Sequence, residues 1–312
     1  MFSIGSRAAV TSCGAGRRLA AITTNVPLRL LDSVWHPNSA TNADAFCIRE
    51  STAVLLDGAA PRGNERVSAE ADDTVWLVRR FIEEWATAGT RGDADARRCD
   101  VRARVEAARA ILKREYAALC AAAGILPPEQ PFACLAIAEL EGSVLDLFNM
   151  GDLSTLVRAP DGSLQRFGAS AVRELDRRAL DELGRLLAAG VEPHAERRAR
   201  LGPMILAHRA LRNQLPGYDV LDLEDGGAAR FEHRAFGASA VRHVLMMSDG
   251  FYRLVDTFER YTDGTLFHAV EQRGLAALLQ ELREVEGNDP ECRRYLRFKT
   301  HDDATALWLE PS

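Results

Sequence analysis

Three apolar segments of this chain end in an aspartate that stands next to a glycine. The three sequences are Leu55-Leu56-Asp57-Gly58, Asn149-Met150-Gly151-Asp152 and Met247-Ser248-Asp249-Gly250. One such pair on its own is typical of a turn after a strand. Carboxylates brought together at strand ends repel one another unless a cation neutralises them. Because oxygen ligands favour Mg²⁺, Mn²⁺ or Ca²⁺ over zinc, the repeated pattern indicates a site for a hard divalent cation.

The hydrophobic pattern around these segments predicts strands and helices in alternating groups. Apolar runs with hairpin signals at 141–142 and 160–162 predict strands over 52–56, 132–140, 144–150, 153–157, 164–167, 241–247 and 304–309. Helical periodicity predicts helices over about 72–85, 100–124, 172–190 and 266–285. Strands joined by hairpins fit antiparallel sheets covered by helices better than a parallel doubly wound sheet.

Two further acidic sites complete an ordered series along the chain. Asp44 lies in Asn42-Ala43-Asp44-Ala45-Phe46, and Asp302-Asp303 precede the last predicted strand. The succession Asn-x-Asp-x-Phe, strand-Asp-Gly, strand-Gly-Asp, strand-Ser-Asp-Gly and Asp-Asp-x-Thr resembles the type 2C (PPM) protein phosphatase family over roughly residues 25–310. Each motif alone is weak, and their order carries the resemblance, which is to a divergent bacterial-type member.

The resemblance implies an α+β fold, a four-layer αββα sandwich of two antiparallel sheets flanked by helices, with metal ions at one end of the sheets. By position, Asp57 would bridge two metal ions, and the carbonyl of Gly58 would complete the second site. Asp249 and Asp302 would hold the first ion. Asp152 would share a third ion with Asp249. The expected cofactor is therefore two Mn²⁺ or Mg²⁺ ions, with room for a third.

The same resemblance assigns the remaining acidic residues and the reaction. Asp44 would orient a metal-bound water and so act in catalysis together with Asp57, while Asp303 and Thr305 would support the site. A hydroxide bridging two metals would attack a phosphate monoester in line. The absence of G-x-S-x-G and H-C-x₅-R motifs agrees with a reaction that needs no protein nucleophile. The expected substrate is phosphoserine or phosphothreonine on a protein partner.

Several positions depart from the family pattern. Ser39 stands where the family has a phosphate-binding arginine, and Ala43 replaces an acidic or amide residue. Ala59 and Ala60 follow the second motif, where a histidine or small residue and a glycine are usual, and Leu153 replaces a serine. We hypothesise that Arg62 binds the substrate phosphate instead; a solvent-exposed loop arginine is the alternative. Two other functions stay open, a degenerate member that binds a phosphorylated partner without turnover, and a small-molecule phosphatase.

Charge and composition exclude other classes of protein. The net charge of −6 gives no general attraction for nucleic acid or an anionic membrane, and no apolar run is long enough to span one. The 6 cysteines lack C-x-x-C spacing, which predicts free thiols and a cytoplasmic protein. We expect a single phosphatase domain over residues 1–312, with 191–227 as an irregular flap or insertion. Its many arginines fit either a basic lid or a solvated helix face, and the sequence does not indicate the oligomeric state.

Overall fold

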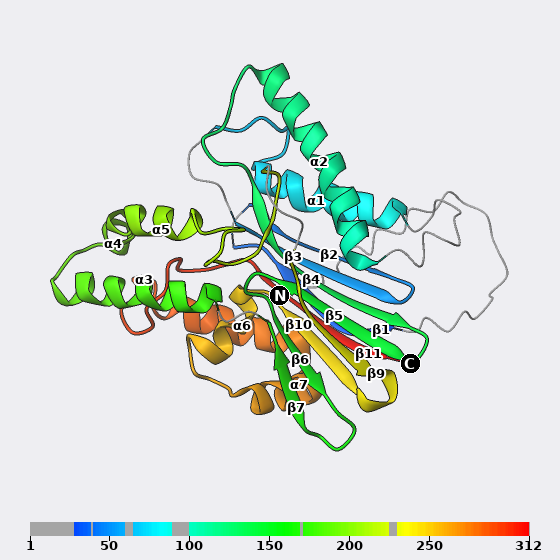
Figure 1. Cartoon of the computed structure of the whole chain (residues 1–312). Coiled ribbons are helices and arrows are strands. Elements are labelled where there is room, and N and C mark those ends of the chain that lie inside the picture. The colour runs from blue at the N-terminus through cyan, green and yellow to red at the C-terminus, as the bar shows by residue number, and fades with distance from the viewer. Residues whose placement is uncertain are drawn as a thin grey trace, which may run out of the picture.

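Two antiparallel sheets lie face to face in the centre of the molecule (Figure 1). The computed structural model describes residues 28–38, 40–59, 65–88, 100–168, 171–224 and 230–311. Within these ranges one sheet has the strand order β1-β11-β10-β6-β7 and the other β2-β3-β4-β5-β9, with β8 paired to β4. Both sheets pair strands from distant parts of the chain, so residues far apart in sequence meet at their ends.

The strands and helices have the following bounds. The first sheet contains β1 (Leu28–His36), β6 (Ser154–Arg158), β7 (Leu164–Phe167), β10 (His243–Met247) and β11 (Ala304–Pro311). The second contains β2 (Asp44–Arg49), β3 (Thr52–Ala59), β4 (Phe132–Glu141), β5 (Val144–Met150), β8 (Leu221–Asp222) and β9 (Glu232–Gly237). The helices are α1 (Asp73–Ala88), α2 (Val101–Ala123), α3 (Ala171–Ala188), α4 (His194–Arg200), α5 (Gly202–Arg209), α6 (Asp249–Asp256) and α7 (Asp263–Gly287).

Three apolar cores separate four layers, as predicted. Along β3, Leu55 faces the core between the sheets, whereas Leu56 faces the core under α1 and α2. Along β10, Met246 faces the inner core and Met247 the core under α6 and α7. Because successive strand residues point to opposite faces, a strand buried on both faces needs apolar residues at every position. This explains why these strands are continuous apolar runs in the sequence.

The sequence patterns missed several elements and did not predict the interruption of one helix. β1, β2, β8, β9 and α6 were not predicted, and α6 begins at Asp249, within the motif Met247-Ser248-Asp249-Gly250. The predicted helix over 266–285 is interrupted in α7 at Gly274, whose φ of 76° is left-handed. There the carboxylate of Asp32 accepts a hydrogen bond from the amide of Leu275 at 2.8 Å, which replaces a helical hydrogen bond.

The segment predicted to be irregular contains two short helices, α4 and α5, which lie with α3 to one side of the sheets (Figure 1). Part of its positive charge is structural. Arg197 is fully buried and donates to the carbonyls of Val191 at 3.0 Å and Glu291 at 2.5 Å. Arg212 pairs with Glu129 at 2.5 Å. These two arginines anchor the segment to the body of the molecule. The flap over residues 191–227 stays a prediction.

Candidate metal centre

Asp44 and Asp57 face each other across the β2–β3 pair, because the antiparallel register places them directly opposite. The side chain of Asp44 is buried, at 2% exposure, and its Oδ2 accepts a hydrogen bond from the hydroxyl of Thr305 on β11 at 2.7 Å. Its Oδ1 is buried without a hydrogen-bond partner. A buried acceptor without a partner is costly, and such an atom often marks a place for a bound group.

The carboxylates at the strand ends lie within electrostatic range of one another. The backbone amide of Asp249, at the start of α6, donates to Oδ2 of Asp57 at 3.4 Å. Loss of hydration raises the pKa of Asp57 well above its ordinary value, and the charges of Asp249, Asp44, Asp152 and Asp302 raise it further. Five acidic residues separated by as many as 258 positions therefore converge within range of one another's charge.

Asp152 occupies the side of the cluster that adjoins α3. Loss of hydration and the charge of Asp249 raise the pKa of Asp152 to about 6, although a hydrogen bond from the Cys134 thiol lowers it. Nearby, Arg173 of α3 donates to the hydroxyl of Ser154 at 2.7 Å. Asp176, also on α3, has a pKa raised to about 8 by loss of hydration and by the charges of Asp152 and Asp249. Asp176 was not identified from the sequence, because it lies within an ordinary amphipathic helix.

Asp302 differs from the other carboxylates because two basic side chains hold it. The ammonium of Lys299 donates to its Oδ1 at 2.6 Å, and Arg253 of α6 donates to its Oδ2. Loss of hydration alone would raise the pKa of Asp302, but the charges of Lys299 and Arg253 lower it below the ordinary value. Neither basic residue was predicted to belong to the site, although Lys299 is one of only two lysines in the chain and stands three residues before Asp302.

Asp303 points to the loop that precedes Asp44. Its Oδ1 accepts a hydrogen bond from the amide of Asn38 at 2.7 Å, and its Oδ2 accepts one from the amide of Ala43 at 2.9 Å. The carboxylate thereby fixes the approach of the chain to β2.

Two glycines beside the aspartates allow backbone segments to touch. A Cβ added to Gly58 would lie 2.4 Å from Cγ2 of Thr74 and 2.6 Å from the carbonyl oxygen of Ala43. A Cβ added to Gly250 would lie 1.9 Å from the carbonyl oxygen of Asp303. In the folded chain the two glycines permit close approach of protein atoms, which brings the strand ends together.

The donor set suits a hard divalent cation. All five converging side chains are carboxylates; Asp57, Asp152 and Asp249 are partly exposed, so an ion can reach them from solvent. In the side-chain positions described, however, no three His, Cys, Asp or Glu residues are arranged so that they could hold a metal ion. Asp302 is turned towards its basic partners. Arg62 and Ser39 lie outside the described residues, so the proposed phosphate-binding arginine stays a prediction.

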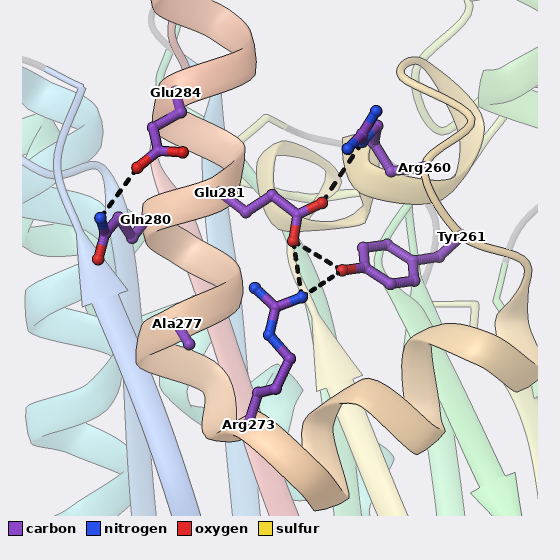
Figure 2. Close-up of a pocket in the computed structure, with 7 residues that line it drawn as sticks. All are labelled: Arg260, Tyr261, Arg273, Ala277, Gln280, Glu281 and Glu284. Atoms are coloured by element: carbon purple, nitrogen blue, oxygen red, sulfur yellow. Dashed lines mark hydrogen bonds and ion pairs between the residues drawn. The ribbon is translucent and has the colours of Figure 1, made fainter.

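A polar hollow of about 560 Å³ lies elsewhere, over the kinked helix α7 (Figure 2). Figure 2 shows that its charges are paired within it: Glu281 accepts from Arg273 at 2.9 Å and from the Tyr261 hydroxyl at 2.7 Å, and Arg260 lies 3.4 Å from the same carboxylate. None of the converging aspartates lines it. The hollow is therefore separate from the candidate metal centre.

A family model described as protein phosphatase 2C matches residues 38–284, which is more than three quarters of the 312-residue chain. The chain belongs to the protein phosphatase 2C family. The matched region includes Asp44, Asp57, Asp152 and Asp249, whereas Asp302 and Asp303 lie beyond its end. No curated protein sequence gives a significant match.

Solved structures of bacterial type 2C phosphatases share the fold. The catalytic domain of the serine/threonine phosphatase PstP, in complex with two manganese ions, aligns with a TM-score of 0.51 at 18% identity, covering 91% of this chain and 97% of that one. Stp1 from Staphylococcus aureus aligns with a TM-score of 0.54 at 12% identity over 96% and 99%. PppA from Pseudomonas aeruginosa gives 0.53 at 15% identity over 91% and 98%. The likeness confirms the predicted sandwich.

Two predictions about the rest of the chain concern cysteines and membranes. The four cysteines in the described ranges, Cys47, Cys120, Cys134 and Cys292, are free thiols, as the spacing predicted. Across the same ranges, no helix combines the length and the apolar character needed to cross a membrane.

Proposed function

We propose that this type 2C family member is a metal-dependent phosphatase that hydrolyses phosphoserine and phosphothreonine on proteins. The observation that supports it most is the convergence of Asp57 with Asp44, Asp152, Asp249 and Asp302 at the ends of strands from both sheets. Carboxylates gathered in this way raise one another's pKa and destabilise the fold unless a cation joins them. A purely structural role would favour neutral residues at these positions.

The proposed ligands are Asp57, Asp152, Asp249 and Asp302, with the carbonyl oxygen of Gly58. When bound, two Mn²⁺ or Mg²⁺ ions, with a third if Asp152 and Asp249 recruit one, would lower the pKa of water and neutralise charge on the phosphoryl oxygens. The structure of the PstP catalytic domain in complex with two manganese ions supports this number of ions.

The chain's own residues would position water and control its proton. Thr305 holds Oδ2 of Asp44 at 2.7 Å, which leaves Oδ1 as an acceptor for the attacking water. Loss of hydration raises the pKa of Asp44 well above its ordinary value, and the charge of Asp303 adds to this. A carboxylate with a raised pKa is a better proton acceptor near neutral pH. Asp44 would therefore orient the water and receive its proton.

Binding of the substrate phosphate requires a basic group, because Ser39 stands where the family has arginine. Arg62, four residues after Gly58, remains our proposal for that group. We expect Arg62→Ala to raise KM for a phosphate ester many-fold while kcat changes less, since the arginine would contact phosphate in both the ground state and the transition state. An unchanged KM would contradict this role.

The function is tested by assaying the purified full chain with p-nitrophenyl phosphate and a phosphothreonine peptide, in EDTA and in MnCl₂ or MgCl₂. We expect turnover of both substrates only with the metal, and loss of turnover in Asp57→Asn. Metal binding without turnover of either substrate would overturn the enzyme assignment and favour a phosphoprotein-binding role. Turnover of p-nitrophenyl phosphate but not of the peptide would point to a small phosphorylated substrate.

A further inference from the structure

Lys299 places an ammonium group among the candidate metal ligands. It lies in the segment between α7 and β11, and its Nζ is 2.6 Å from Oδ1 of Asp302. A lysine ammonium is charged near neutral pH, and this one forms an ion pair with a carboxylate that would bind a divalent ion.

Arg253, the second basic side chain that holds Asp302, is fixed in place. The side chain of Arg253 is 7% exposed, and its Nη1 lies 3.4 Å from both Glu286 and the carbonyl oxygen of Lys299. The side chain of Lys299, in contrast, is 44% exposed, and its ammonium donates a hydrogen bond to Asp302. A half-exposed side chain with four rotatable bonds can swing into solvent, whereas a buried guanidinium with two acidic partners cannot.

We propose that Lys299 is a displaceable internal cation that holds Asp302 when no metal is bound and leaves it when a divalent ion binds. The proposal depends on the proposed function, because it assumes that Asp302 is a metal ligand. A divalent ion and an ammonium repel each other strongly at contact distance, so they cannot share one carboxylate oxygen. Lys299 thereby neutralises part of the acidic cluster in the metal-free chain and lowers its affinity for metal.

The first test measures Mn²⁺ binding by isothermal titration calorimetry. Lys299→Met keeps most of the apolar stem and removes the charge, and Lys299→Arg keeps the charge. Lys113→Met is the matched control, because Lys113 is the only other lysine and lies on α2, in the opposite helix layer. We expect Lys299→Met to bind Mn²⁺ about ten-fold more tightly, equivalent to ~1.4 kcal/mol, and the other two variants to bind like wild type.

The second test needs no variant. An amine-reactive acylating reagent is applied to the wild-type chain with and without Mn²⁺, and labelling is located by mass spectrometry. Because the chain has two lysines, Lys113 is a control within the same molecule. We expect Mn²⁺ to increase the labelling rate of Lys299 several-fold, as the ammonium leaves its ion pair, and to leave the rate of Lys113 unchanged.

The outcomes separate this inference from the proposed function. If wild type binds Mn²⁺ but neither the affinity of Lys299→Met nor the labelling of Lys299 changes, the internal-cation role is wrong and the metal site stands. If neither wild type nor Lys299→Met binds Mn²⁺, both proposals fail. Binding by Lys299→Met where wild type binds weakly or not at all supports the inference.

Discussion

Replacing Gly250 with alanine should separate the two strand ends that meet at the acidic cluster. The added Cβ would lie 1.9 Å from the carbonyl oxygen of Asp303, whereas ordinary contacts begin at 3.4 Å. The start of α6 and the segment before β11 must therefore move apart by about 1.5 Å. Overpacking against backbone costs about 3 kcal/mol at the upper end of the usual range, and alanine recovers roughly 0.5–1 kcal/mol in a helix. The net destabilisation is about 2 kcal/mol.

The chain contains a matched control for this change. Gly264 also follows an aspartate in the first turn of a helix whose N-cap is a hydroxyl residue, Thr262 in α7 compared with Ser248 in α6. A Cβ added to Gly264 would meet its nearest atoms at 3.9 Å, which is ordinary contact. Gly264→Ala should therefore leave stability unchanged or raise it by up to ~1 kcal/mol.

Thermal unfolding followed by circular dichroism measures both variants in EDTA. We expect Gly250→Ala to lower Tm by roughly 4–8 °C relative to wild type, and Gly264→Ala to lower it not at all. Mn²⁺ should also stabilise Gly250→Ala less than wild type, because the shift moves Asp302 away from Asp249. Equal Tm values for the two variants would show that the α6 backbone does not touch Asp303, and the described packing of the site would then be wrong.

Three further predictions concern charge. Asp57→Asn should raise the Tm of the metal-free chain at pH 8 by about 2–5 °C, because it removes one of several mutually repelling carboxylates. The same variant should lose the stabilisation that Mn²⁺ gives to wild type. A Tm below that of wild type in EDTA would contradict the repulsion between the carboxylates. The pKa values of Asp152, about 6, and Asp176, about 8, are raised above their unfolded values near 4. The folded chain therefore binds more protons than the unfolded chain from about pH 4 up to about pH 6 at Asp152, and up to about pH 8 at Asp176. The Tm of the metal-free chain should rise as pH falls from about 9 to about 6, and Mn²⁺ should flatten the profile. Arg197→Ala should cost about 2–4 kcal/mol in urea unfolding, because it removes a fully buried guanidinium and the hydrogen bonds that it donates to the carbonyls of Val191 and Glu291. Its exposed neighbour is the control, and Arg198→Ala should cost less than ~0.5 kcal/mol. Equal effects would show that Arg197 does not anchor the segment.

Several features of the fold could be predicted from the sequence because local patterns decide them. The strands β3 and β10 are buried on both faces, so they are continuous apolar runs, and the turn residues between β4 and β5 mark a hairpin. β9 was missed because most of its residues are exposed and its first half is polar, which gives no continuous apolar signal. The helix α6 was missed because Asp-Gly is compatible with both a turn and a helix start, and packing against β10 and β11 decides between them.

The sequence by itself determined the order of the acidic motifs, and with it the family and the two-sheet architecture, because each motif depends on a few adjacent residues. Only the tertiary structure decided which other charged side chains lie beside the acidic motifs. Lys299, Arg253 and Asp176 reach the cluster from the segment before β11, from α6 and from α3, and their sequence positions do not show that these three parts of the chain meet. The charge around a carboxylate depends on distances in space, and those distances are fixed by how the two sheets and their helices pack.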